Sequence, residues 1–252
     1  MFERNLNLSK TEFIAYLKCP FKFHIIKDLN SQIDQSMKID YFDYEPNLAD
    51  GIKRHLWFQN FYEKFGEDIQ NNIYLLLSES DKNEEWKKKF IKYEINRYKQ
   101  TPAYWEPVAV ELFLKNPLYR GQIDRIDQLD AQGHCRIVEY KPYPKEFDEE
   151  ELIFYSVLLT SELPHQNLPN ITKVNEIGVY YYFTGEFVIA KVSHETIQAF
   201  EMYMENIRKE ILNANLIKKK MDCEVSITDC LYRDICQRIQ IKNQKIITFS
   251  VI

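Results

Sequence analysis

The stretch VEYKPYP contains two charged residues, Glu139 and Lys141, within a segment of Ile, Val and Tyr that is typical of a buried strand. Side chains two positions apart in a strand project from the same face, so the acid and the amine lie beside each other. Charges on a partly enclosed face are costly unless they are paired or bound to a metal. From these two residues alone, a solvated sheet edge and a reactive site both stay open.

A further acid is expected on that face. The segments before and after the turn sequence DAQG are predicted to form a hairpin. A turn centred in the middle of DAQG places Asp124 opposite Glu139, unless the register slips. Two carboxylates that meet across a hairpin suit Mg²⁺ or Mn²⁺, because hard divalent cations prefer oxygen ligands. Lys141 would then orient a water or stabilise charge on a reacting phosphate.

The surrounding pattern places this hairpin between helices. Ser9 and Glu12 have the spacing of a capping box, which predicts a first helix that Pro20 kinks or restarts. The other expected elements are a helix at about 47–65, a more exposed helix at about 84–100, strands at about 107–114, 119–129 and 135–142, a helix at about 148–161, a hairpin turning at Thr184 and Gly185, and a helix at about 194–217. Helices before and after a central mixed sheet of about five strands describe an α/β or α+β fold.

The composition is that of one globular domain spanning residues 1–252. The chain is 45% hydrophobic and 28% charged, with only 6 Gly and 9 Pro, so it can bury a sizeable core and shows no long flexible linker. The start MFERNLNLSK lacks a basic segment followed by an apolar one, and no apolar run is long enough for a membrane span, so a cytoplasmic protein is expected. The net charge of -5 argues against unspecific coating of nucleic acid, although a cleft can be locally basic.

The five cysteines do not suggest a disulfide scaffold. Cys223, Cys230 and Cys236 lie close together near the end of the chain, which in a reducing compartment points to a metal site. Cys135 lies in the strand that leads to Glu139, and we expect it to be a small core residue.

The segments GQID, VEYK and EELIFY together resemble the PD-(D/E)xK nuclease superfamily in its RecB-like branch, where the pattern is G-x-x-D, then (D/E)-x-K, then Q-x-x-x-Y. The resemblance implies a restriction-endonuclease-like core in which Asp124 and Glu139 ligate the metal and Lys141 is the catalytic lysine. Tyr155 matches the tyrosine of the last motif, whose helix is implied to position DNA. Glu151 departs from the family, because glutamine is usual at that place.

The segment GIKRH matches the G-x-x-x-H motif of the same branch, which implies that His55 is a metal ligand. A lone histidine on a helix is more often structural or exposed, but the neighbouring motifs favour the ligand role. Glu111, in the strand before GQID, is open to two interpretations. It is either an outward-facing strand residue or an additional metal or water ligand.

The segment SKTEFIAYLKCPFKF resembles the start of iron–sulfur members of this branch. The resemblance implies that residues 1–30 and 217–240 form a cluster-binding part, in which the two ends of the chain are joined by a [4Fe–4S] cluster on Cys19, Cys223, Cys230 and Cys236. The tail departs from the usual C-x-x-C-x-x-x-x-x-C ending, since Ile227 stands where a cysteine is expected. A longer loop through Cys223, another cluster type, zinc and a degenerate site all stay open.

These observations lead to the hypothesis of a Mg²⁺- or Mn²⁺-dependent DNA nuclease, similar to the CRISPR-associated RecB-like exonuclease family. Its expected substrates are single-stranded or duplex DNA ends, in CRISPR spacer acquisition or DNA repair, with CRISPR adaptation proteins as partners. Two other classes stay open. One is a non-catalytic, nucleic-acid-binding iron–sulfur subunit of a larger DNA-processing complex, and the other is a cysteine-metal interaction module in which the carboxylates are incidental.

Overall fold

The computed structural model describes residues 6–20, 23, 46–71, 84–144, 149–163, 168 and 170–213. The chain divides into two compact units, the first formed by Met1–Lys10 with Ile39–Asn213 and the second by Thr11–Lys38 with Ala214–Ile252. None of the helices within the described ranges is both long and apolar enough to cross a membrane.

The second unit contains most of helix α1, Lys10–Lys18. The helix ends before Cys19, and helical conformation resumes at Pro20, as the sequence predicted. The rings of Tyr16 and Phe23 pack edge to face, with their centroids 5.5 Å apart. The other cysteines of the expected cluster, Cys223, Cys230 and Cys236, lie outside the described residues. The iron–sulfur site and the cluster-binding part at 1–30 and 217–240 therefore stay predictions.

The first unit contains the predicted helices and strands, with one additional short strand. In chain order they are β1 (Leu8–Ser9), α3 (Pro46–Asn71), α5 (Glu85–Gln100), the short helix η3 (Pro102–Tyr104), β2 (Ala109–Lys115), β3 (Tyr119–Gln128), β4 (His134–Lys141), α6 (Glu149–Glu162), β5 (Lys173–Tyr181), β6 (Glu186–Lys191) and α7 (His194–Asn213). They form a mixed sheet of six strands with helices on both sides, which confirms the predicted α/β class.

The sheet is interrupted along one edge of β3. Arg120 pairs with both β1 and β2, and Arg125 pairs with both β2 and β4, so β2 occupies one edge while β1 and β4 share the other. On the shared edge the ladder with β1 ends at Arg120, and the ladder with β4 begins at Arg125. Residues 121–124, the GQID segment, lie between these two ladders. Their backbone is therefore level with a gap between strands.

The β3–β4 hairpin has the predicted register. Arg125 faces Val138, so the same alignment brings Asp124 level with Glu139. Gly133 closes the turn with a φ of 80°, a left-handed conformation that glycine adopts at little cost.

The β5–β6 hairpin turns at Thr184 and Gly185, as predicted, but its connection begins two residues earlier. Tyr181 faces Glu186, so the connection spans residues 182–185. The reason lies in Tyr182, which is buried and whose backbone N–H donates to the carbonyl of Lys141 at 3.0 Å. The chain therefore follows β4 for one more residue before it turns.

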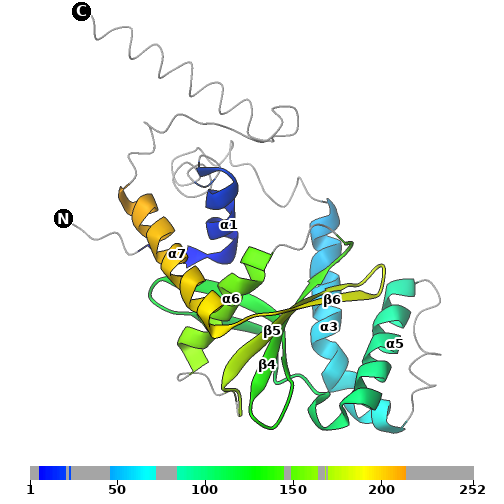
Figure 1. Cartoon of the computed structure of the whole chain (residues 1–252). Helices are drawn as coiled ribbons and strands as arrows, with labels where there is room; N and C mark the ends of the chain where they lie inside the picture. The colour runs from blue at the N-terminus through cyan, green and yellow to red at the C-terminus, as the bar shows by residue number, and fades with distance from the viewer. Residues whose placement is uncertain are drawn as a thin grey trace, which may run out of the picture. The chain divides into compact units, whose positions relative to one another are not determined.

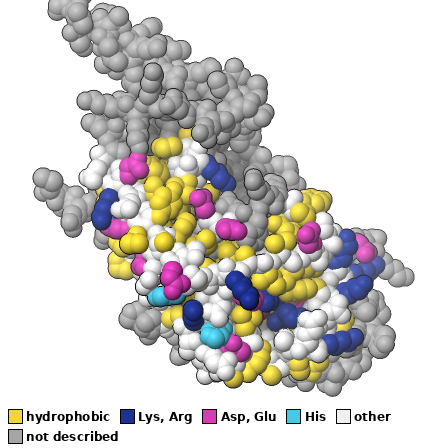
Figure 2. All heavy atoms as spheres, in the orientation of Figure 1, with side chains coloured by type: hydrophobic (Ala, Val, Ile, Leu, Met, Phe, Trp, Pro, Cys, Tyr) yellow, Lys and Arg dark blue, Asp and Glu magenta, His cyan; other side chains and the backbone are white. Residues whose placement is uncertain are grey.

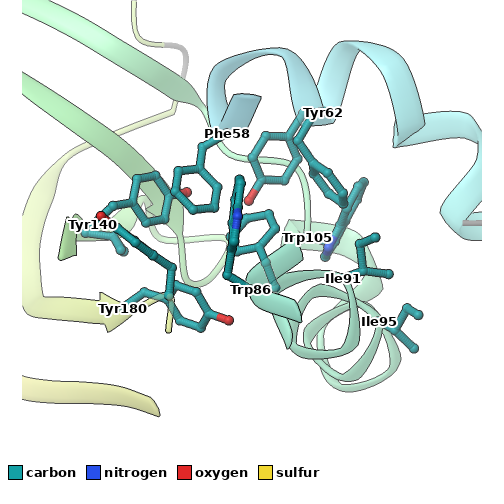
Figure 3. Close-up of a cluster of buried hydrophobic side chains, with 12 residues drawn as sticks. Phe58, Tyr62, Trp86, Ile91, Ile95, Trp105, Tyr140 and Tyr180 are labelled. Carbon is teal, nitrogen blue, oxygen red and sulfur yellow. The ribbon is translucent and has the colours of Figure 1, made fainter. Parts of the chain in front are cut away.

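Among the described helices, α3 and α5 lie on one side of the sheet and α6 and α7 on the other (Figure 1). An aromatic core fills the space between the α3–α5 pair and strands β4 and β5 (Figure 3). Phe58 of α3 stacks on Tyr140 of β4 with ring centroids 4.2 Å apart. Helix α5, predicted to be the more exposed helix, buries Trp86 and Phe90 in this core, because its apolar residues recur at helical spacing between the lysines.

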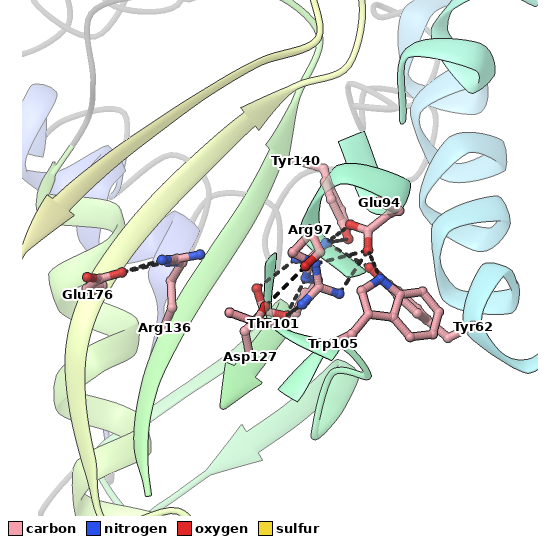
Figure 4. Close-up of polar contacts among 10 residues, drawn as sticks. Tyr62, Glu94, Arg97, Thr101, Trp105, Asp127, Arg136, Tyr140 and Glu176 are labelled. Carbon is pink, nitrogen blue, oxygen red and sulfur yellow. Dashed lines mark hydrogen bonds and ion pairs between the residues drawn. The ribbon is translucent and has the colours of Figure 1, made fainter. Parts of the chain in front are cut away.

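A buried network of charges lies beside this core (Figure 4). The guanidinium of Arg125 is fully buried and donates two hydrogen bonds of 2.7 Å to Asp127 and one of 2.8 Å to Glu94. The Glu94 carboxylate also accepts hydrogen bonds from Arg97 and from the indole N–H of Trp105. The network joins α5 to β3, so it holds the strand that carries Asp124 in place.

Candidate active site

Three predicted ligands meet beside the gap in the sheet. His55 Nδ1 of α3 lies 3.1 Å from Glu111 Oε1 and 3.5 Å from Asp124 Oδ1. One potential ligand atom from each residue lies within 4.8 Å of the others. Burial disfavours a charged imidazole, but hydrogen bonds to Asp124 and Glu111 outweigh it and raise the pKa of His55 to about 10. A protonated imidazole thus offsets the two acids where a cation would otherwise do so.

Glu111 holds its position through a strained backbone. It lies in β2, where Val110 faces Arg125 and Leu112 faces Ile123, so it is level with Asp124. Its φ is 49°, an uncommon conformation for a non-glycine residue that costs on the order of 1 kcal/mol or more. Its second carboxylate oxygen accepts a 2.6 Å hydrogen bond from Gln122. The Glu111 side chain is 12% exposed and faces His55, which favours the second of the two earlier interpretations. Its role as a metal or water ligand stays a prediction.

Asp124 lies where β3 has no strand partner on one edge, and its side chain accepts a backbone hydrogen bond there. Its Oδ2 atom accepts a 2.7 Å hydrogen bond from the backbone N–H of Tyr140, which fixes a nearly buried carboxylate at the junction of β3 and β4. The glycine of GQID serves the same junction, because a Cβ on Gly121 would lie 2.7 Å from a ring carbon of Tyr155. Gly121 therefore lets the Tyr155 ring of α6 pack closely against the strand that bears Asp124.

Glu139, Lys141 and Glu151 form an alternating row of charges with a further lysine, Lys10. Lys141 Nζ lies 3.0 Å from Glu139 Oε1 and 3.1 Å from Glu151. Lys10 contacts Glu151 and lies 3.9 Å from Glu139 Oε1. Its Nζ atom is also 5.4 Å from the centre of the Tyr155 ring. The predicted catalytic pair Glu139 and Lys141 is thus brought together with both residues of the last motif.

The two acids of this row are perturbed in opposite directions. Burial, followed by the nearby charge of Asp124, raises the pKa of Glu139 to about 8, even though Lys141 and Lys10 act against the shift. Burial acts the same way on Glu151, but the two lysines prevail and lower the pKa of its carboxyl to about 2. The surrounding protein therefore stabilises the negative charge of Glu139 less well than that of Glu151.

Glu139 does not belong to the compact group of His55, Glu111 and Asp124. Its Oε2 atom is nevertheless buried and has no hydrogen-bond partner within the part of the chain that the structure describes. Carboxylate oxygens and an imidazole are suitable ligands for Mg²⁺ or Mn²⁺, and a buried carboxylate oxygen without a donor is what a bound cation would satisfy. The residues present therefore fit a divalent metal.

The family model for the PD-(D/E)XK nuclease superfamily matches residues 7–237. The chain belongs to this superfamily. The match spans the whole described sheet and every residue of the candidate site, so the predicted restriction-endonuclease-like core and its nuclease character are confirmed at the level of the superfamily.

A structural comparison finds a candidate exonuclease from Eubacterium rectale, known from a crystal structure. The two share 11% sequence identity and a TM-score of 0.44, over 89% of this chain and 92% of that one. A likeness at this level carries no argument of its own, so the assignment rests on the family model.

Two polar residues of this PD-(D/E)XK site, Lys10 and Gln122, were not predicted from the sequence. Lys10 reaches the site because β1, which ends at Ser9, pairs in parallel with β3, a contact between distant segments that no local spacing reveals. Gln122 could have been found, since it lies two residues before Asp124 in a strand and such residues share a face. The sequence did hold one indication of Lys10. Glutamate stands at position 151 in place of glutamine, and a buried carboxylate is stable only with a positive charge nearby.

Proposed function

We propose that this PD-(D/E)XK protein is a Mg²⁺- or Mn²⁺-dependent deoxyribonuclease that hydrolyses phosphodiester bonds at DNA ends. The observation that carries the proposal is the excess of acid beside the interrupted sheet edge. In this proposal the metal is held by His55, Glu111 and Asp124 and shared with the unpartnered Oε2 atom of Glu139.

The chain's own groups account for the remaining tasks. Lys141, held by Glu139 and Glu151, has an ammonium group fixed beside the acids, where it can orient an attacking water and stabilise charge on a phosphate. The carboxylates of Glu139 and Glu151 raise the pKa of Lys141, so the amine stays charged at neutral pH although burial opposes it. A divalent ion bound beside it would polarise the phosphate and lower the pKa of a coordinated water.

The proposal is tested by digesting end-labelled single-stranded and duplex DNA while Mg²⁺ or Mn²⁺ is titrated. We expect cleavage only with a divalent ion, and a loss of at least about 100-fold in Glu139→Gln and Lys141→Met. Glu205→Gln is the control, because Glu205 forms a surface pair with Arg208 on α7. Metal-independent DNA binding without cleavage would instead identify a non-catalytic subunit.

The resemblance to the CRISPR-associated RecB-like exonucleases supports a finer proposal, in which the enzyme trims DNA ends during spacer acquisition or repair. The presence of CRISPR adaptation genes beside the coding sequence, and co-purification of their products, would test it.

The [4Fe–4S] cluster is a separate proposal. It requires about four iron atoms per chain and a visible absorption band, both lost in Cys19→Ser. A colourless, zinc-containing protein would contradict it.

A further inference from the structure

Two aromatic rings lie stacked at the surface just beyond the strand end that carries Lys141. The ring centroids of Tyr143 and Phe183 are 4.8 Å apart, and the ring planes are inclined by 30°. The backbone supports the pair, because the N–H of Phe183 donates to the carbonyl of Pro142 at 3.2 Å. Tyr143 is nevertheless 56% exposed. An open aromatic face is thus fixed two residues from the proposed catalytic lysine.

Positive charge borders this ring pair. The guanidinium of Arg54 lies 4.9 Å from the centre of the Phe183 ring, and Lys89 Nζ donates a 2.6 Å hydrogen bond to the carbonyl of Phe183. Arg54 directly precedes His55 in α3 and also forms an ion pair of 3.8 Å with Asp50. Figure 2 shows Lys and Arg side chains interspersed with hydrophobic and acidic ones on one face of the molecule. Two positively charged side chains, Arg54 and Lys89, therefore lie against Phe183 of the ring pair.

A nucleobase matches both features. Bases stack on aromatic side chains without regard to sequence, and arginine adds attraction to the phosphates and to the ring faces. Inside a duplex both faces of a base are covered by neighbouring base pairs. At a blunt end one face is free, but the base is still held in its pair, so an unpaired base can adjust to an exposed ring most readily. A single exposed aromatic residue needs no explanation, but a supported ring pair between Arg54 and Lys141 is a specific arrangement.

We infer that Tyr143 and Phe183 form a stacking platform for an unpaired nucleobase next to the scissile phosphate. The inference rests on the proposed nuclease function and sharpens it, because it names DNA with a single-stranded end as the preferred substrate. Arg54 supplies positive charge for the adjoining backbone. Tyr143 is then a residue that determines specificity, while the chemistry stays with the metal site.

The test uses binding in EDTA, where no cleavage occurs, to single-stranded DNA that carries 2-aminopurine at its end. Stacking on the platform quenches the fluorescence of this base. We expect Tyr143→Ala to abolish the quenching and to weaken single-strand binding by about 5- to 100-fold. Tyr143→Trp keeps a stacking ring and should retain both. The affinity for blunt duplex DNA should change less than about two-fold in either variant.

Tyr203→Ala is the matched control. Tyr203 is 39% exposed on α7 and packs against Phe200 with ring centroids 5.6 Å apart, so the substitution also removes an exposed ring from an aromatic pair. It should leave quenching and affinity unchanged. Thermal unfolding of each variant checks that the fold is intact.

The platform and the nuclease can fail separately. If Tyr143→Ala binds and quenches as the parent does, or loses single-strand and duplex binding equally, the platform is wrong even when the parent cleaves DNA. If the parent never cleaves but shows quenching that depends on Tyr143, the platform stands and the nuclease proposal falls.

Discussion

Two groups of charged side chains on opposite sides of strand β3 differ in their balance of positive and negative charge. Asp124 and Arg125 are adjacent residues of β3, so their side chains project to opposite sides of the strand. On the side of Arg125, two carboxylates meet two guanidinium groups, namely Glu94, Asp127, Arg97 and Arg125. At the candidate active site, four carboxylates meet two lysines and one imidazole, namely Glu111, Asp124, Glu139, Glu151, Lys10, Lys141 and His55.

This difference is the one expected between a structural group of charges and a site that takes up a cation. In the balanced network, burial opposes the charged form of Asp127, yet Arg125 and Arg97 hold the pKa of that carboxyl below its ordinary value. At the active site, burial and Asp124 raise the pKa of Glu139 despite two nearby lysines. A balanced group is complete within the protein, whereas a group with surplus acid is stabilised by adding a cation.

The largest effect is expected from unbalancing the structural network. Arg125→Met leaves Glu94 and Asp127 buried with one fewer partner, and removing one member of a buried ion pair costs about 3–5 kcal/mol. Urea unfolding should show this loss. Lys88→Ala removes an exposed pair with Glu85 and should cost less than about 1 kcal/mol. Equal losses in the two variants would erase the distinction between buried and exposed pairs.

The active site should instead make the metal-free protein less stable as pH rises. Folding raises the pKa of Glu139 from 4.5 to about 8, so its contribution to stability is fully present below pH 4.5 and is lost as pH rises through about 8. Between pH 4.5 and 6.5 this loss is about 2 to 3 kcal/mol. His55, whose pKa rises from 6.5 to about 10, adds a loss of the same sign above pH 6.5.

The measurement is the free energy of unfolding against pH for the parent and for Glu139→Gln, each with EDTA and with saturating Mg²⁺. The parent in EDTA should lose stability relative to Glu139→Gln as pH rises, and Mg²⁺ should reduce that relative loss. If the free energies of unfolding of the two proteins change with pH in parallel, folding does not raise the pKa of Glu139.

Local patterns sufficed to predict most of the fold and the hairpin that presents the acids. The alternation of β3 and β4 and the position of DAQG gave the register that the structure confirms, because hairpin pairing depends on neighbouring residues. The spacing of α3 placed His55 on a helix, but its approach to Glu111 depends on packing against β2. The positive φ of Glu111 had no sequence signal, since glutamate ordinarily avoids it.

Contacts between distant segments could not be predicted from those patterns. Lys10 lies beside Glu151 because β1 pairs with β3, and a strand of two residues has too little periodicity to be recognised. The burial of α5 was missed for another reason. Its run of lysines indicated an exposed helix, although Trp86 and Phe90 lie on the opposite stripe and enter the aromatic core.

The strain at Glu111 gives a smaller effect, of about 1 kcal/mol. With no metal present, Glu111→Gly relieves the backbone at a φ of 49°, whereas Glu111→Ala removes the same carboxylate but keeps a Cβ. The glycine variant should therefore be the more stable of the two. At Val110 the usual order should hold, with alanine more stable than glycine. Both Glu111 variants should bind Mn²⁺ more weakly than the parent, as measured by calorimetry.

The smallest effect concerns the ion pair between Lys10, the residue after β1, and Glu151 of α6. Glu151 takes the place where glutamine is usual in the family pattern, and it contacts both Lys10 and Lys141. Without Lys10, the negative charge of Glu151 would be paired with Lys141 alone. This makes Lys10 a positioning residue for the proposed catalytic lysine, and its importance should depend on the acid at position 151.

A double-mutant cycle on the rate of DNA cleavage tests that dependence. In the parent, Lys10→Met leaves the full charge of Glu151 to Lys141, which draws the amine away from Glu139, so kcat/KM should fall about three-fold, a coupling on the order of 0.6 kcal/mol. In the Glu151→Gln background the same substitution should change kcat/KM little, because no acid remains there to be balanced. Lys209→Met, which breaks an exposed pair with Glu205, should be neutral in both backgrounds. Equal losses from Lys10→Met in the two backgrounds would mean that Lys10 acts on DNA directly rather than through Glu151.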